Sequence, residues 1–100
     1  MKLAIVTGAT SGIGRATAIM LAENNYNLIL TGRRNEQLDA LKREIEVKYK
    51  RDVLTLNFDI RSKEAVDKAI DGLPERWRKI DVLVNNAGLA VGLNHIQDGE

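Results

Sequence analysis

Short apolar runs alternate along the chain with longer segments in which apolar residues recur at helical spacing. Four short runs are rich in apolar residues: residues 2–6, 27–31, 52–58 and 81–88. Because they are bounded by glycine or polar residues and carry many β-branched side chains, they predict buried strands. Three longer segments follow the first three runs and predict helices: residues 13–25, 35–50 and 62–73.

The three expected helices differ in how much of their surface is apolar. Residues 13–25 are apolar nearly all round, which predicts a helix packed between a sheet and its neighbours. Residues 35–50 place Leu38, Leu41 and Ile45 on one face among charged residues, the pattern of an amphipathic helix. The third begins at a predicted N-cap, Ser62. Its expected inward-facing residues are Val66, Ala69, Ile70 and Leu73.

Strands that alternate with helices and are apolar throughout predict a parallel sheet covered on both faces. The fold class is therefore α/β, a Rossmann-type doubly wound parallel sheet. Right-handed crossovers place its strands in the order 3-2-1-4. Residues 89–100 end in polar residues without starting a convincing element. We therefore expect residues 1–100 to form the N-terminal portion of a longer single-domain protein.

Composition and charge narrow the possible partners. Fifteen Lys and Arg residues against fourteen Asp and Glu give a net charge of +1. This balance argues against a nucleic-acid-binding or membrane-binding surface, which would need a clear basic excess. The sequence contains no cysteine, which favours a reducing compartment and excludes thiolate metal sites. We expect a cytoplasmic protein that binds neither nucleic acid nor membrane, and no metal ligand set is evident.

The stretch TGATSGIGRATA, residues 7–18, places three glycines directly between the first strand and the first helix. The backbone N–H groups at a helix N-terminus attract phosphate, and glycines let the phosphate approach the backbone closely. Gly8 can make the tight exit from the strand, Gly12 can leave room for a pyrophosphate, and Gly14 can let helix and strand pack closely. Hydroxyl or main-chain donors could come from Thr10, Ser11 and Ile13. A plain turn before a helix is the alternative.

The end of the second strand is where a dinucleotide-binding fold meets the adenosine ribose. An acidic residue there usually binds the 2′-hydroxyl of NAD, whereas this chain has Gly32, Arg33 and Arg34 and no acid before Glu36. Two guanidinium groups suit a 2′-phosphate, so NADP is favoured over NAD. Two solvated arginines in a turn are the alternative.

Two motifs together resemble the short-chain dehydrogenase/reductase family. One is Thr7-Gly8-x3-Gly12-x-Gly14, and the other is Asn85-Asn86-Ala87-Gly88 after the fourth strand. Asp59, after the third strand, fits the same pattern. The segments GRR, LPERW and NNAGLAVG look most like the NADP-dependent 3-hydroxy acid (serine) dehydrogenases of this family.

The resemblance implies roles for individual residues in cofactor binding. The loop from Gly8 to Gly14 would bind the pyrophosphate, and Arg33 and Arg34 the 2′-phosphate. Asp59 would accept a hydrogen bond from the adenine amino group, with Ile60 lining that pocket. Near the adenosine ribose the resemblance places Asn85, Ala87 and Gly88. Many NADP-binding members carry a basic residue before the second glycine, where this chain has Ser11.

The family's catalytic serine and Tyr-x-x-x-Lys pair have no counterpart in these 100 residues. Tyr26 is followed four residues on by Leu30, and Tyr49 by Val53, so no catalytic residue is assigned. We expect the cofactor-binding part of an NADP-dependent short-chain oxidoreductase that interconverts a small alcohol, such as a 3-hydroxy acid or serine, and a carbonyl. We expect it to be a homo-oligomer. The alternative is a non-catalytic module that binds or senses NADP(H).

Three further residues have a predicted place. Arg15, on the first turn of the first helix, either reaches a phosphate or points into solvent. Trp77 is expected to pack at the corner between the third helix and the fourth strand. Asp81 is expected to fix the turn into that strand.

Overall fold

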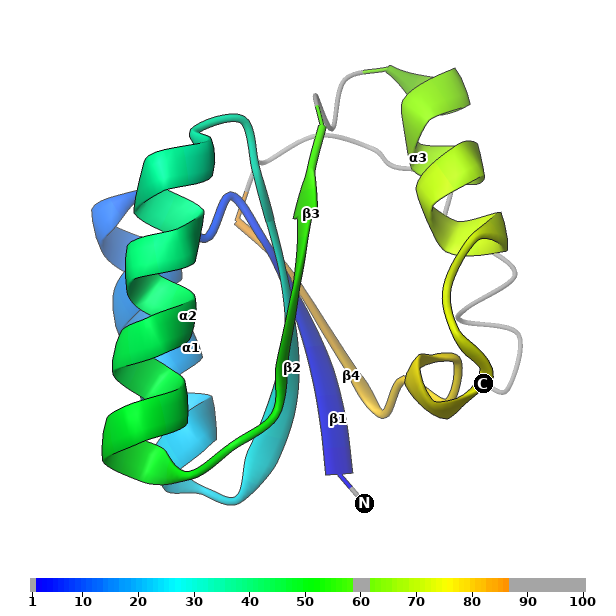
Figure 1. The fold of residues 1–100 in the computed structure, drawn as a ribbon. Coiled ribbons are helices and arrows are strands. Elements are labelled where there is room, and N and C mark those ends of the chain that lie inside the picture. The colour runs from blue at the N-terminus through cyan, green and yellow to red at the C-terminus, as the bar shows by residue number, and fades with distance from the viewer. Residues whose placement is uncertain (1, 59–61, 87–100) are drawn as a thin grey trace.

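Four strands form one parallel sheet at the centre of the computed structural model, which describes residues 2–58 and 62–86 (Figure 1). The strands are β1 (Lys2–Thr7), β2 (Tyr26–Gly32), β3 (Val53–Asn57) and β4 (Val82–Asn85). Their order across the sheet is β3-β2-β1-β4, which confirms the predicted order. In the register of the strands, Ile5 of β1 lies opposite Ile29 of β2 on one side and Leu83 of β4 on the other.

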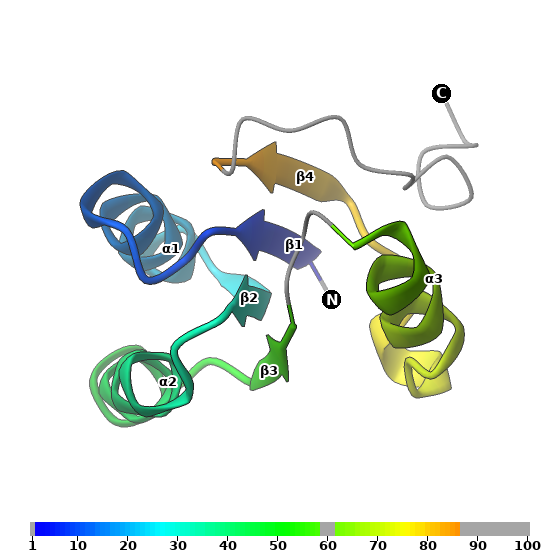
Figure 2. The ribbon, with the colours of Figure 1, turned by 90° about the horizontal axis from the view of Figure 1, so that it is seen from above.

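The helices form a layer on each face of the sheet. Helices α1 (Gly12–Glu23) and α2 (Asn35–Tyr49) cover one face, and α3 (Lys63–Asp71) covers the other, as the view from above shows (Figure 2). A short 3₁₀ helix, η1 (Glu75–Trp77), leads from α3 toward β4. The Ser62 hydroxyl accepts a hydrogen bond from the amide N–H of Ala65 at 3.2 Å, so Ser62 is the N-cap that the sequence predicts.

Each face of the sheet has its own apolar core, because successive residues of a buried strand point to opposite faces. On the α1 and α2 side, Leu38, Leu41 and Ile45 of α2 are buried as predicted. They pack with residues of the strands and α1: Ala4, Val6, Ala18, Ala22, Leu28, Leu30 and Val53.

On the α3 side, the core is built by β1, β2, α3 and the segment that follows α3. Trp77 is only 7% exposed and packs in this core, which confirms the predicted packing role. The other buried members of this core are Leu3, Ile5, Ile29, Val66, Ile70 and Leu73. Ala69, also expected to face inward, is half-buried.

Helix α1 is less buried than its apolar sequence predicts. Ile13 is 74% exposed and Met20 is 53% exposed. The buried residues of α1 are Gly14, Ala18 and Ala22. Because they recur every four residues and are small, they form one narrow face that brings the helix close to the sheet. The expectation of a helix enclosed on several sides is therefore wrong for the part of the chain that is described.

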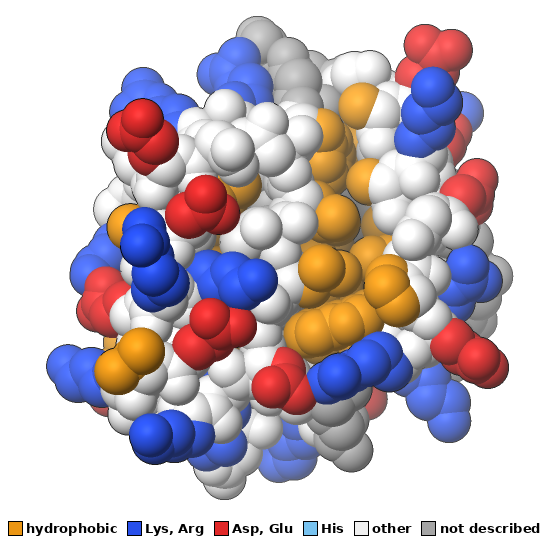
Figure 3. Space-filling model, viewed as in Figure 1, with side chains coloured by type: hydrophobic (Ala, Val, Ile, Leu, Met, Phe, Trp, Pro, Cys, Tyr) orange, Lys and Arg blue, Asp and Glu red, His pale blue; other side chains and the backbone are white. Residues whose placement is uncertain are grey.

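Apolar side chains remain partly uncovered along β3, beside α3 (Figure 3). Leu54, Leu56 and Phe58 belong to this region; each is half-buried and packs against the α3-side core. Among residues 2–58 and 62–86, no helix combines the length and the apolar character needed to cross a membrane.

Asp81 links the start of β4 to the start of β1. The amide N–H of Leu3 donates to Oδ2 of Asp81 at 2.9 Å, and the amide N–H of Asp81 donates to the carbonyl oxygen of Leu3 at 2.8 Å. Asp81 thus fixes the entry into β4, as expected, and it does so by binding the strand next to it.

Candidate functional site

The loop between β1 and α1 turns tightly and is held by hydrogen bonds to its own backbone. Gly8 has a φ of 62°, in the left-handed region that favours glycine. The Ser11 hydroxyl donates to the carbonyl oxygen of Gly8 at 2.9 Å and accepts from the amide N–H of Gly14 at 3.0 Å. Ser11 is therefore the N-cap of α1, and its side chain binds within the loop.

The other two glycines of this loop have different surroundings. A Cβ added to Gly14 would lie 2.1 Å from the carbonyl oxygen of Gly8, so only glycine lets the helix start this close to the preceding turn. A Cβ added to Gly12 would meet no atom within 4 Å. Packing against the preceding turn thus requires glycine at position 14, whereas the space in front of Gly12 is open to a ligand. Ile13, between them, lies on the exposed first turn of α1.

The loop after β2 lies against the loop after β1. The amide N–H of Ala9 donates to the carbonyl oxygen of Thr31 at 3.0 Å, and a Cβ on Gly32 would be only 3.3 Å from Cγ2 of Thr10. These contacts bring the glycine loop and the start of the Arg33–Arg34 segment to the same edge of the sheet.

Arg33 and Arg34 are both exposed at this edge. Arg34 precedes α2 as its N-cap residue and makes no side-chain cap hydrogen bond. The acidic residue of the first turn of α2 is Glu36, and no carboxylate occurs between Gly32 and Asn35. The edge therefore presents basic side chains beside the N-terminus of α2, where the helix dipole adds further positive potential.

Asn85, at the end of β4, binds the end of β1. The Thr7 hydroxyl lies 3.1 Å from Oδ1 of Asn85 and 3.3 Å from the carbonyl oxygen of Val84, so it donates toward both acceptors. Asn85 thus ties the end of β4 to the end of β1. The proposed ribose contact of Asn85 stays a prediction.

Four predicted site residues lie outside the described residues: Asp59, Ile60, Ala87 and Gly88. Their predicted roles at the adenine and ribose therefore stay predictions.

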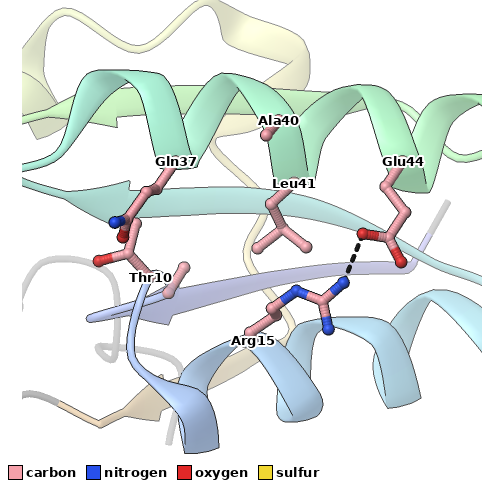
Figure 4. Close-up of a pocket in the computed structure, with 7 residues that line it drawn as sticks. Thr10, Arg15, Gln37, Ala40, Leu41 and Glu44 are labelled. Carbon is pink, nitrogen blue, oxygen red and sulfur yellow. Dashed lines mark hydrogen bonds and ion pairs between the residues drawn. The ribbon is translucent and has the colours of Figure 1, made fainter.

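A hollow of about 410 Å³ lies between α2 on one side and the loop after β1 with the first turn of α1 on the other (Figure 4). At one end, the side chains of Thr10 and Gln37 face each other, and Leu41 forms the apolar floor. At the other end, a guanidinium nitrogen of Arg15 lies 2.6 Å from a carboxylate oxygen of Glu44. The remaining lining residues are Ala9 and Ala40.

The sequence did not point to this hollow. Gln37, Leu41 and Glu44 share one face of α2 by helical spacing, but nothing in that spacing says that α1 faces them. The side chain of Arg15 pairs with Glu44 while remaining 51% exposed, and its contact with a phosphate stays a prediction. Within residues 2–58 and 62–86, no group of three or more His, Cys, Asp or Glu side chains could hold a metal ion.

Comparisons with known proteins find curated relatives that match most of the chain. NADP-dependent 3-hydroxy acid dehydrogenase YdfG of Salmonella typhi is 48% identical over 91 residues, which cover 91% of this chain and 35% of that protein. Serine 3-dehydrogenase of Rhizobium radiobacter is 48% identical over 88 residues, covering 88% of this chain and 34% of that protein. The chain thus spans about a third of the length of these curated relatives.

Solved structures give the same result. L-sorbose reductase from Gluconobacter frateurii, crystallised with NADPH and L-sorbose, superposes with a TM-score of 0.81 at 33% identity, covering 88% of this chain and 34% of that one. The family model described as short chain dehydrogenase matches residues 2–99. The chain has a Rossmann-type sheet in the order 3-2-1-4, with a glycine loop at the carboxyl end of β1, and the family model matches nearly the whole sequence. The chain therefore belongs to the short-chain dehydrogenase family.

Proposed function

We propose that this chain forms the adenosine- and pyrophosphate-binding part of an NADP(H)-dependent oxidoreductase. The observation that carries the proposal is the contact between the glycine loop and the segment that leads to Arg33. Thr10 of the loop packs so closely on Gly32 that a Cβ added to Gly32 would lie 3.3 Å from Cγ2 of Thr10. One cofactor can then contact both, its pyrophosphate at the N-terminus of α1 and its ribose at the end of β2.

The residues present fit a dinucleotide. Gly12 leaves its face of the loop open, so a pyrophosphate can approach the backbone N–H groups at the start of α1. Arg33 and Arg34 supply cationic donors, and no carboxylate between Gly32 and Asn35 would repel a 2′-phosphate. A charge-assisted hydrogen bond contributes roughly 1.5–3 kcal/mol. One arginine contact should therefore favour NADP over NAD by about tenfold to a hundredfold.

The substrate class is proposed from the relatives. The relatives named 3-hydroxy acid dehydrogenase and serine 3-dehydrogenase support a small alcohol as substrate, oxidised to a carbonyl or formed from one. When bound, the nicotinamide would supply hydride transfer. The residues of this chain would bind and orient the adenosine end of the cofactor. We propose that the 100 residues are the N-terminal part of a longer single-domain enzyme, as their share of the relatives' length suggests.

A non-catalytic NADP(H)-binding module is the second candidate, because the sequence has no Tyr-x-x-x-Lys pair. Turnover distinguishes the two candidates. The full-length protein, assayed with NADP and 3-hydroxy acids or serine, should change the absorbance of the nicotinamide if it is an enzyme. Cofactor binding without turnover of any small alcohol would favour the module.

A substitution at Gly12 tests the cofactor site itself. Gly12→Val places its Cβ in the open face of the loop, where a Cβ meets no other atom of the chain within 4 Å, so the protein should fold while NADPH affinity falls at least tenfold. Ala16→Val places the same valine side chain at an exposed position of α1 and should leave affinity unchanged. NADPH fluorescence titration measures both. Equal affinity of Gly12→Val and the unchanged protein would contradict the proposed site.

We further propose a cytoplasmic homo-oligomer. The absence of cysteine in the sequence suits a reducing compartment. Light scattering of the full-length protein would test the oligomeric state.

A further inference from the structure

Arg15 and Glu44 are the charged residues that line the hollow between α1 and α2. Their side chains remain 51% and 35% exposed, so water screens the ion pair between them. An exposed ion pair of this kind contributes little to stability. Arg15 can therefore exchange Glu44 for another anion at small cost.

Thr10 connects this hollow to the proposed ribose site. Its side chain lines the hollow together with Arg15, and its Cγ2 atom also faces Gly32, directly before Arg33. An anion held by Arg33 beside Thr10 would thus lie near the end of the hollow that Thr10 and Gln37 line (Figure 4).

Arg15 is suited to such an anion for two reasons. It sits on the first turn of α1, where the helix dipole favours negative charge. A guanidinium also binds phosphate oxygens through two parallel hydrogen bonds, which are stronger than contacts with a neutral group.

We propose that Arg15 is a second cationic contact for the adenosine 2′-phosphate and that Glu44 competes with the phosphate for it. This inference rests on the proposed function. The 2′-phosphate would draw the Arg15 guanidinium away from Glu44 toward Thr10.

Two substitutions have opposite predicted effects on NADPH, and neither should change the affinity for NADH. Arg15→Gln removes the cation and should weaken NADPH binding by about fivefold to tenfold. Glu44→Gln removes the competitor and should strengthen NADPH binding by about threefold. A gain of affinity cannot arise from misfolding, so Glu44→Gln keeps the test decisive even if Arg15→Gln destabilises the protein.

Matched controls make the same charge changes elsewhere on the surface. Arg43→Gln and Glu46→Gln lie on α2 but do not line the hollow, and both should leave the NADPH to NADH ratio unchanged. In the double variant Arg15→Gln/Glu44→Gln, the gain caused by Glu44→Gln should disappear. A gain that persists there would overturn the proposal, because the Glu44 carboxylate would then act on the cofactor by direct charge repulsion and not by pairing with Arg15.

The measurement is fluorescence titration of the full-length protein with NADPH and NADH, repeated with 2′,5′-ADP and 5′-AMP as competitors. Unchanged NADPH affinity in Arg15→Gln, or an equal loss for both cofactors, would overturn the role of Arg15 and leave the proposed function standing. An unchanged protein that binds neither cofactor would overturn both.

Discussion

Replacing Gly14 by alanine should separate the packing role of the glycine loop from its cofactor role. The new Cβ would lie 2.1 Å from the carbonyl oxygen of Gly8, 2.9 Å from its carbonyl carbon and 3.0 Å from the Cα of Ala9. All three are backbone atoms, so no side-chain rotation relieves the overlap. The start of α1 must move away from the turn.

The expected loss of stability follows from three contributions. Alanine is preferred over glycine inside a helix by about 1 kcal/mol, which favours the variant. Overpacking typically costs about 1–3 kcal/mol and sometimes more, and a backbone overlap this short belongs at the upper end. Moving the helix start also lengthens the 3.0 Å hydrogen bond from Gly14 to Ser11, and losing that cap costs about 1 kcal/mol. The free energy of unfolding should fall by about 3 kcal/mol.

Urea denaturation followed by circular dichroism measures this change. With a slope of about 1.5–2 kcal/mol per molar urea, the midpoint should fall by about 1.5–2 M. Gly12→Ala is the matched control, because its Cβ meets no atom within 4 Å; its midpoint should stay within about 0.3 M of the unchanged protein. A Gly14→Ala variant as stable as the Gly12→Ala control would refute the reasoning.

Four further substitutions have expected outcomes. Ser62→Ala removes the cap of α3 and should lower the unfolding free energy by about 1 kcal/mol in urea, whereas Ser62→Asp should retain it. Trp77→Ala empties a buried site and should cost about 3–5 kcal/mol by the same assay, with Trp77→Phe losing less. Asp81→Ala leaves the amide of Leu3 without its 2.9 Å acceptor and should cost about 1–3 kcal/mol; Asp81→Asn, which keeps an oxygen there, should restore most of it. Arg33→Asp should reverse the preference for NADPH over NADH in a fluorescence titration, and equal affinities in the unchanged protein would show that the arginines do not bind the 2′-phosphate.

The strands and their order could be predicted from the sequence because the signals are local. Each apolar run is short and ends at glycine or a polar residue, and the rule of right-handed crossovers then leaves few arrangements. Helix α2 was equally clear, since Leu38, Leu41 and Ile45 repeat at helical spacing. In α1 the same reasoning failed. Its buried face is formed by the small residues Gly14, Ala18 and Ala22. The larger apolar residues Ile13 and Met20 lie outside that face, so hydrophobicity alone did not predict which side of α1 is buried.

The candidate site was predicted in part, for a similar reason. The glycine spacing predicted a close approach at Gly14, and the structure gives the atom that requires it. The pairing of Arg15 with Glu44 could not be predicted, because the two residues are 29 positions apart on different helices. Contacts of this kind depend on how two helices lie against each other, which single-sequence periodicity does not encode.

The central position of β1 has a consequence for the order in which the protein folds. β1 pairs with β4 through contacts 78 residues apart, whereas its pairing with β2 spans about a third of that separation. Closing a chain loop three times longer costs about 1 kcal/mol more entropy.

The β1-α1-β2 unit can therefore form early, during synthesis, and it contains the whole glycine loop. The second edge of β1 stays unpaired until Asp81 and β4 have left the ribosome. Docking of β4 is then a late step in folding, and during the interval before it the nascent chain exposes a strand edge that other chains could pair with.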